Sequence, residues 1–221
     1  YVALIQAKSS DESATQRFTQ RIEEAVEQGT DLVNQLLSFG QRDEEELIAI
    51  QLNDLVRQAV ELLQHSLPAG IELVTQLDLT LPAIAGDAAQ LRQVLLNLAL
   101  NACDAMPAGG TLILATTQCR YEPGQEPPEP ALPFQNYVVL RVTDTGEGMD
   151  EATLGKIFDP FFTTKKNRHG LGLGLAVVYG VVRQHGGSIR VTSQPGQGTT
   201  FTIFFPALSE AAAPPPAQPQ S

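Results

Sequence analysis

Three polar side chains lie on one face of a predicted helix in the middle of the chain. Asn97, Asn101 and Asp104 are spaced by four and three residues within the run Asn-Leu-Ala-Leu-Asn-Ala-Cys-Asp-Ala. Positions i, i+4 and i+7 of a helix share a face, so they form a polar stripe on an otherwise apolar helix. Amide oxygens suit Mg²⁺ held jointly with substrate phosphates, because this ion keeps several waters and takes few protein ligands. The alternative is a helix with one solvated face and no ligand.

A second motif, Asp144-Thr-Gly146-Glu-Gly148-Met149, follows a predicted strand. Its glycines allow the backbone to approach a ligand closely. An ionised carboxylate only accepts hydrogen bonds, so Asp144 can bind an exocyclic amino group such as that of adenine. A plain β-turn explains the same pattern, because Asp and Gly are common turn residues.

A cationic cluster follows the aromatic segment Phe158–Thr164. Lys165, Lys166 and Arg168 place three of the chain's 14 Lys and Arg residues within four positions of an acidic protein, and His169 comes next. The aromatic side chains fit an ordinary core. Beside a glycine-rich loop, however, such a cluster of positive charge favours a polyphosphate ligand.

That glycine-rich loop is Gly170-Leu-Gly172-Leu-Gly174-Leu-Ala, which leads directly into a predicted helix. Loop glycines together with the free N–H groups of a helix start can bind an anion. The loop is not a Walker A motif, because it lacks Gly-Lys-Ser/Thr, and it is not a Rossmann loop, because no strand precedes it closely. A glycine-rich hinge is the alternative.

The elements that must position these motifs follow from periodicity and turn residues. Residues 17–40 carry apolar residues at three- and four-residue spacing, which indicates a bundle helix, with an ordinary core helix as the alternative. The proline-rich residues 122–133 form a loop, and the Ala/Pro/Gln residues after Pro206 form a disordered linker. We expect helices at about 53–65, 88–106, 151–157 and 173–185, and strands at 71–77, 82–85, 111–118, 137–143, 188–193 and 199–205.

The composition excludes several classes of function. The 221 residues include 14 Lys and Arg against 25 Asp and Glu, a net charge of -11, and such a surface repels nucleic-acid phosphates. No apolar run approaches the roughly 18 residues needed to cross a bilayer, and no signal peptide is recognisable. Cys103 and Cys119 lack metal-ligand spacing and the three histidines lie far apart, so we expect reduced thiols and no zinc site.

In this order and spacing the motifs resemble the catalytic, ATP-binding domain of bacterial sensor histidine kinases, within the superfamily shared with gyrase, heat-shock chaperone and mismatch-repair ATPases. The resemblance covers about residues 17–207. The implied fold is α+β, a two-layer α/β sandwich of a mixed sheet and three helices preceded by a helical-hairpin segment. Residues 97–105 resemble the N box, 144–149 the first glycine box, 158–165 the F box, 170–175 the second glycine box, 196–201 the third, and 32–39 the second helix of the dimerisation hairpin.

The resemblance also implies roles in binding ATP and Mg²⁺. Asn101 would hold the metal with Asn97 beside it, and Asp144 would bind the adenine amino group. Lys165 and the Gly170–Gly174 loop would meet the phosphates, and Thr199 would support the adenine side. Asp104 stands where some relatives carry a lysine. The full set of expected nucleotide-binding residues is Asn97, Asn101, Asp104, Asp144, Gly146, Gly148, Met149, Phe158, Thr164, Lys165, Gly170, Gly172, Leu173, Gly174, Leu175 and Thr199.

Three parts are expected along the chain: a partial dimerisation and phosphotransfer hairpin at 1–45, the ATP-binding domain at 46–207, and the linker at 208–221. The family's acceptor histidine lies on the first hairpin helix and precedes an acidic residue, whereas the first histidine here is His65. Residues 1–7 resemble the last turns of that helix, which would place the acceptor before Tyr1. The implied partners are a second copy, bound through the hairpin, and the receiver domain of a response regulator. We expect a cytoplasmic location, with membrane attachment only through parts outside this chain.

The implied function is that of a protein-histidine kinase module in two-component signalling, which donates the γ-phosphoryl group of Mg-ATP to a histidine. An ATP-hydrolysing clamp is a rival, but such relatives carry a Glu base four residues before the metal-binding Asn. Asn97 stands there, and an amide cannot take a proton at neutral pH. The remaining alternatives are a non-autophosphorylating ATP-binding regulatory or interaction module and an anti-sigma-type serine kinase.

Overall fold

A computed structural model describes residues 47–64, 66–120, 136–164 and 171–208, all within one compact unit, Glu45–Ser221. The predicted hairpin, the proline-rich loop and residues 209–221 of the predicted C-terminal linker lie outside the described residues, whereas the N–H of Leu208 donates to the carbonyl oxygen of Ala83 (2.7 Å). The described elements are β1 (Ile48–Ile50), α3 (Leu52–Gln64), β2 (Ile71–Leu77), β3 (Ile84–Gly86), α4 (Ala88–Asp104), β4 (Gly110–Arg120), β5 (Asn136–Asp144), α5 (Glu151–Leu154), α6 (Gly174–Gln184), β6 (Ser188–Ser193) and β7 (Thr199–Pro206).

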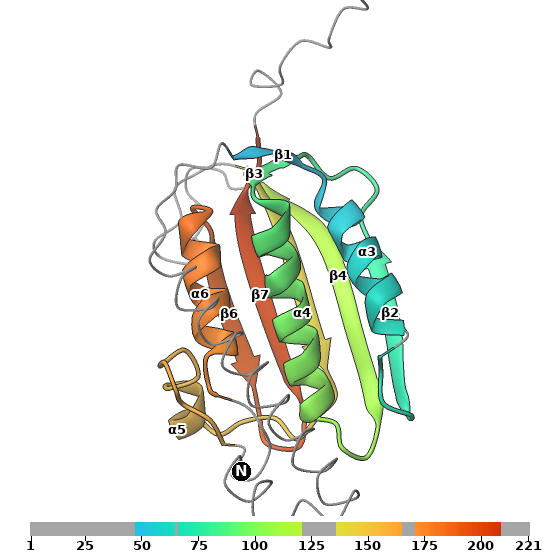
Figure 1. The fold of residues 1–221 in the computed structure, drawn as a ribbon, viewed down its shortest axis with the longest axis vertical. Helices are drawn as coiled ribbons and strands as arrows, with labels where there is room; N and C mark the ends of the chain where they lie inside the picture. Colours follow the sequence, from blue (N-terminus) through green and yellow to red (C-terminus); the bar gives the residue numbers. More distant parts are fainter. Residues whose placement is uncertain (1–46, 65, 121–135, 165–170, 209–221) are drawn as a thin grey trace, which may run out of the picture. The chain divides into compact units, whose positions relative to one another are not determined.

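Five strands form a mixed sheet in the order β2-β4-β5-β7-β6. β2 and β4 run parallel, and the other neighbouring pairs are antiparallel. Figure 1 shows α3, α4 and α6 side by side over one face of this sheet, and their apolar side chains share one core with the strand residues that face them. The two-layer sandwich of a mixed sheet and three helices, expected from the resemblance, is confirmed.

The central helix α4 follows from a cap and an apolar stripe. Asp87 precedes the helix, and its Oδ1 accepts hydrogen bonds from the N–H groups of Ala89 (2.7 Å) and Gln90 (3.2 Å). Such a cap satisfies N–H groups that have no partner within the helix. Four large side chains on the sheet-facing side are buried, and each contributes roughly 1.5–3 kcal/mol by leaving water; they are Leu91, Val94, Leu95 and Leu98.

Tertiary packing rather than intrinsic propensity explains α6. The helix is rich in valine, a residue whose branched Cβ disfavours helix. Its buried residues are Ala176, Val177, Val178, Val181 and Val182. Their burial against α4 and the sheet outweighs the small propensity cost.

The structure corrects several sequence-based boundaries and adds one strand. β1 was not expected; it pairs antiparallel with β3 in a separate two-stranded sheet. α4 ends at Asp104 rather than near Met106, and α5 ends at Leu154 rather than Ile157, since turns follow each of them. None of the helices in the described part of the chain is long and apolar enough to cross a membrane.

A buried polar network fixes α3 to the parallel strand pair. The side chain of Asn53 is 8% exposed; its Nδ2 donates to the carbonyl oxygen of Asp78 (2.7 Å), and its Oδ1 accepts from the hydroxyl of Thr116 (2.7 Å). The N–H of Asp78 in turn donates to the Thr116 hydroxyl (3.2 Å). The network therefore joins α3, β4 and the end of β2.

Replacing Asn53 with alanine should lower the free energy of unfolding by about 2 kcal/mol, because it leaves buried polar groups without partners. Urea denaturation measures this change. The matched control is Gln58→Ala on the same helix, which removes an exposed hydrogen bond to Arg92 (3.2 Å). That change should stay within about 0.5 kcal/mol of wild type. Equal destabilisation by the two variants would contradict a structural role for the network.

Candidate functional site

The candidate site begins where β5 ends. Asp144, the last residue of β5, is 4% exposed and lies opposite Thr199, the first residue of β7. Its Oδ1 accepts hydrogen bonds from the N–H groups of Gly146 (2.9 Å) and Thr199 (3.2 Å). Both of these bonds reach the same oxygen, so Oδ2 is the atom through which this carboxylate can accept a hydrogen bond from a ligand.

Burial raises the pKa of Asp144 above the ordinary value of an aspartate, and the hydrogen bonds from Gly146 and Thr199 oppose this rise. Desolvation penalises the charged form, whereas N–H donors stabilise it. The two backbone donors therefore help a buried carboxylate to remain an acceptor. This arrangement fits the role in amino-group recognition that the sequence assigned to Asp144.

Neighbouring elements hold the loop that follows Asp144. The N–H of Glu147 donates to the carbonyl of Ala105 at the end of α4 (2.9 Å), and its carbonyl accepts from Gly196 in the β6–β7 turn (2.6 Å). The hydroxyl of Thr145 accepts from the N–H of Thr111 in β4 (2.9 Å). The loop is thus fixed by three segments that are far apart in the sequence.

Two glycines allow the loop and the β6–β7 turn to approach one another. Gly148 has φ +65°, and a Cβ there would overlap the carbonyl group of Gln194. Gly198 has φ +81°, and a Cβ there would overlap the carbonyl group of Asp144. An L-amino-acid side chain at either position would face both backbone strain and a clash.

The amide stripe of α4 faces the start of α6. Asn97 Nδ2 donates to the carbonyl oxygen of Gly174, the first residue of α6, at 3.4 Å. A Cβ on Gly174 would lie 3.8 Å from Asn101 Nδ2 and 3.9 Å from the Asn97 side-chain carbon Cγ. Asn97 and Asn101 therefore lie beside the first residue of α6, and Asp104 lies exposed at the last turn of α4.

The first turn of α6 lacks the cap that the other helices of the site possess. Asp87 caps α4 and Asp150 caps α5, each through its side chain, whereas Leu173 precedes α6 and makes no such hydrogen bond. Free N–H groups and the helix dipole make such a terminus attractive to an anion. The amides of Asn97 and Asn101 lie beside it, so the structure places two neutral amide side chains next to a helix start that can attract an anion.

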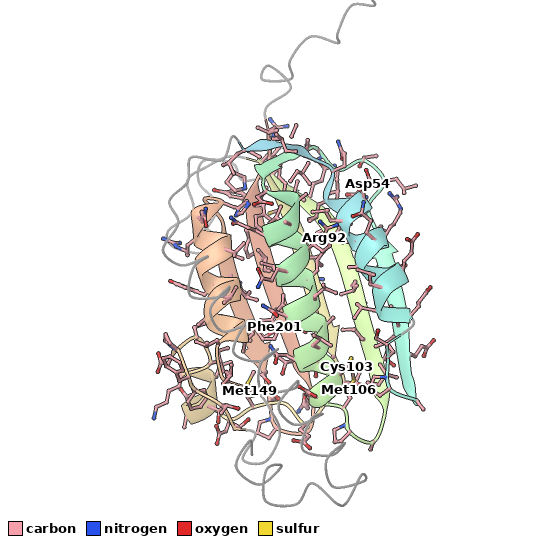
Figure 2. All side chains as sticks on the ribbon, viewed as in Figure 1. Asp54, Arg92, Cys103, Met106, Met149 and Phe201 are labelled. Atoms are coloured by element: carbon pink, nitrogen blue, oxygen red, sulfur yellow. The ribbon has the colours of Figure 1, made fainter. Side chains whose placement is uncertain are left out.

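Figure 2 shows Met106 and Met149 at the end of the sheet where α5 lies, and Arg92 and Asp54 toward the other end. Met106 follows α4, and Met149 follows the loop after β5. The end of α4, the loop after β5 and the start of β7 therefore meet at one edge of the domain.

The aromatic segment and the glycine-rich loop meet through backbone contacts. The N–H of Phe161 donates to the carbonyl oxygen of Gly172 (3.0 Å). Phe161 has φ +68° and is 64% exposed, and φ at Gly172 is +69°. A positive φ at a bulky residue is strained and occurs where the surrounding structure imposes it. Lys165 and Gly170, between these contacts, lie outside the described residues.

The other expected nucleotide-binding residues differ from one another in burial and in their contacts. Leu173 is buried, so its backbone groups rather than its side chain can face a ligand, and Leu175 is partly buried against the main core. Phe158 stacks at a tilt on Tyr179 of α6, with ring centroids 5.1 Å apart. Thr164 is exposed at the edge of the described segment.

Sequence reasoning did not find the contacts that hold the site together. Thr145 and the Ala105 carbonyl lie within the predicted motifs, but their role in holding the first glycine loop, described above, was not expected. Ser193, expected only as the end of a strand, accepts a hydrogen bond from the N–H of Met149 through its hydroxyl (2.8 Å). All of these contacts join residues distant in sequence, and only the spatial proximity of their segments reveals them.

The residues present fit a magnesium ion better than a metal that needs a full protein ligand set. Among the described residues, no group of three or more His, Cys, Asp or Glu side chains could hold a metal. Asn97 and Asn101 supply neutral amide oxygens beside a helix terminus suited to phosphate. Mg²⁺ commonly takes one or two protein ligands and completes its shell with phosphate oxygens and water.

Proteins of similar sequence belong to a family of ATPases and include sensor kinases. Residues 86–209 match the family described as histidine kinase-, DNA gyrase B-, and HSP90-like ATPase. Sensor kinase CckA of Brucella abortus is 40% identical over 189 residues, which are 86% of this chain and 20% of that protein. Sensor histidine kinase ZraS of Escherichia coli is 39% identical over 176 residues, or 79% of this chain and 34% of that protein. The chain therefore spans about a fifth to a third of the length of these relatives.

Solved structures of histidine kinases share the fold. Full-length ShkA in complex with AMPPNP has a TM-score of 0.68 and 28% identity, over 89% of this chain and 40% of that one. The catalytic domain of histidine kinase ThkA has a TM-score of 0.60 and 26% identity, over 73% of this chain and 96% of that one. The chain therefore belongs to the histidine kinase-, DNA gyrase B- and HSP90-like ATPases and carries an ATP-binding domain of the sensor histidine kinase kind.

Proposed function

We propose that this domain binds ATP together with Mg²⁺ and supplies the γ-phosphoryl group to a histidine of a dimerisation helix. Two features at one edge of the domain together support this proposal. One is the buried Asp144 carboxylate, whose Oδ2 can accept a hydrogen bond from a ligand. The other is the start of α6, which has no side-chain cap and lies beside the amides of Asn97 and Asn101. A relative of the same fold, ShkA, was solved in complex with the nucleotide AMPPNP. That complex supports nucleotide binding here.

Each part of the site has a task in this proposal. Asp144 accepts a hydrogen bond from the adenine amino group through Oδ2. The N–H groups at the start of α6 bind phosphate oxygens, with Lys165 and Gly170 expected to add contacts. Asn101 holds Mg²⁺ with Asn97 beside it, and the ion would neutralise phosphate charge when bound. Phosphoryl transfer depends mostly on positioning and charge neutralisation, which these groups provide.

Partners and acceptor follow from the relatives, which are sensor kinases of two-component systems. We propose homodimerisation through the predicted hairpin and transfer from the phosphohistidine to a response regulator receiver domain. A water-activating base is not expected, because Asn97 donates to the Gly174 carbonyl and its amide cannot accept a proton at neutral pH. This feature favours phosphoryl transfer to a histidine over an ATP-hydrolysing clamp. A purely structural interaction module remains the alternative that the following test addresses.

Replacing Asn101 with alanine should weaken AMPPNP binding in the presence of Mg²⁺ by about 5- to 150-fold, which corresponds to roughly 1–3 kcal/mol for a lost ligand to a charged group. Titration calorimetry, with and without a chelator of Mg²⁺, measures the effect. Wild type should lose affinity when Mg²⁺ is removed, and the variant should lose much less.

The matched control is Gln184→Ala, which removes an exposed amide at the last residue of α6, away from its N-terminal end. Its affinity and its Mg²⁺ dependence should equal those of wild type. The metal assignment is wrong if Asn101→Ala binds as tightly as wild type and responds to the chelator in the same way. Failure of wild type to bind any nucleotide would support the interaction-module alternative.

A further inference from the structure

The Ser193 hydroxyl is the point at which three segments of the candidate base-binding site meet. Its oxygen lies 2.8 Å from the Met149 nitrogen, 2.9 Å from the Gly198 carbonyl oxygen and 2.9 Å from the Thr199 hydroxyl oxygen. Met149 ends the first glycine motif, Gly198 directly precedes β7, and Thr199 is the first residue of β7. Ser193 itself is the last residue of β6.

These three contacts fix the direction of every proton among them. A hydroxyl has one hydrogen to donate and two lone pairs to accept with. The Gly198 carbonyl can only accept, so the Ser193 hydrogen must point to it. The Met149 N–H donates a hydrogen bond to one lone pair of the Ser193 hydroxyl oxygen. The Thr199 hydroxyl must then donate its own hydrogen to the remaining lone pair, and this assignment satisfies all three contacts.

With its hydrogen used on Ser193, the Thr199 hydroxyl can offer only lone pairs to any other group. Thr199 is 5% exposed, pairs with Asp144 across β5 and β7, and gives its backbone N–H to Asp144 Oδ1 (3.2 Å). The Asp144 carboxylate likewise only accepts when ionised. Two neighbouring side chains therefore present acceptors, and neither presents a donor.

We infer that Ser193 is a specificity-determining positioning residue: by orienting the Thr199 hydroxyl, it makes the base-binding edge accept hydrogen bonds only. Such an edge selects a purine with an amino group at position 6 and rejects one with a carbonyl there. The inference rests on the proposed function, in which Asp144 meets the base, and on the resemblance, which places Thr199 on the adenine side. Ser193 touches neither base nor phosphate and acts through Thr199.

The test compares the affinities for ATP and inosine triphosphate (ITP) by calorimetry of the whole chain with Mg²⁺. At position 6 the base of ATP carries an amino group and that of ITP a carbonyl, and the base of ITP also carries a hydrogen on N1. Wild type should prefer ATP. Ser193→Ala releases the Thr199 hydrogen, which can then turn toward a carbonyl, so the ratio of ATP to ITP affinity should fall about 5-fold, the value of one neutral hydrogen bond. Ser193→Thr retains the oxygen and should preserve the ratio.

A second variant keeps the test decisive should Ser193→Ala fold poorly. Thr199→Val removes the hydroxyl but retains the side-chain shape and the N–H to Asp144, and it should lower the same ratio. Because the two hydroxyls act as one unit, the double variant should change the ratio no more than either single variant. Thr200→Ala is the matched control, since its hydroxyl pairs with that of Thr143 (3.1 Å) instead of Ser193. Its ratio should equal that of wild type.

The ratio separates specificity from stability. A merely structural role for Ser193 would weaken ATP and ITP equally, and that result would overturn the inference while leaving the proposed function in place. An unchanged ratio in both Ser193→Ala and Thr199→Val would overturn it in the same way. Failure of wild type to bind either nucleotide would overturn the proposed function and this inference together.

Discussion

Replacing Asp144 with asparagine is expected to reduce the ratio of ATP to ITP affinity by about 100-fold or more. A hydrogen bond to a charged group is worth roughly 1.5–3 kcal/mol. The substitution also places an amide N–H where the carboxylate oxygen Oδ2 would accept the adenine amino group, so two donors would face each other. The same N–H can donate to the 6-carbonyl of ITP, which recovers affinity for the wrong base.

Calorimetric titration of both nucleotides in the presence of Mg²⁺ measures this ratio. The matched control is Asp78→Asn, in the loop after β2, where the carboxylate also accepts a backbone hydrogen bond (from Thr80, 2.9 Å). That change should leave the ratio as in wild type. If Asp144→Asn still prefers ATP as strongly as wild type does, Asp144 is a turn residue and the proposed orientation of the base is wrong.

The unfolding temperature distinguishes a lost ligand contact from a damaged fold. Burial raises the pKa of Asp144 in the folded state. A folded-state pKa above the unfolded value means that the folded protein binds the proton more tightly, so this group's contribution to stability falls as pH rises through the folded pKa. At neutral pH the ionised carboxylate therefore opposes folding. Asp144→Asn, without nucleotide, should unfold at the same temperature as wild type or a higher one.

The parts of the fold that depend on local signals could be predicted from the sequence. The bounds of β2 and β6 were predicted to the residue, because each is a short run of strand-forming residues between turn residues. The start of α4 followed from the Asp87 cap and the apolar stripe behind it. The glycines after Asp144 were predicted to let the backbone approach a ligand, and this stays a prediction; the structure shows that Gly148 and Gly198 let the loop after β5 and the β6–β7 turn approach each other.

The remaining features depend on contacts between distant segments. β1 has only three residues, Ile48–Ile50, and exists because β3 pairs with it. Ser193 looked like an ordinary strand end, since its partners Met149 and Thr199 come from separate turns. The positive φ of Phe161 had no signal either, since this residue's backbone partner is Gly172, eleven positions further along the chain. The motifs therefore indicated candidate ligand-binding residues, but not the residues that hold them in place.

The 221-residue chain alone is expected not to phosphorylate itself. Incubated with γ-labelled ATP and Mg²⁺, the 221-residue chain should gain no acid-labile phosphate. Phosphoryl transfer needs a nucleophile in line with the γ-phosphate. The family's nucleophile precedes an acidic residue, whereas His65 precedes Ser66 and His169 precedes Gly170.

His185 is excluded as the acceptor by its surroundings. The ring is 6% exposed, and its Nδ1 lies 2.8 Å from the Val181 carbonyl oxygen, which can only accept, so Nδ1 carries the proton. Its Nε2 accepts from the N–H of Asp87 at 3.0 Å. Both ring nitrogens are therefore occupied within the core, and neither can attack a phosphate.

Phosphorylation should appear when the chain is extended by a hairpin helix that carries a histidine followed by an acidic residue. A phosphohistidine is labile to acid and stable to base, so treating the labelled protein with each identifies the bond. Asn101→Ala in the extended chain should lose most of the label, which ties the transfer to the site described here. Because ATP binding requires no acceptor, the 221-residue chain should bind AMPPNP as tightly as the extended one. Robust acid-labile label on the 221 residues alone would instead identify His65 or His169 as an acceptor, and would show that the hairpin helix is not needed for transfer.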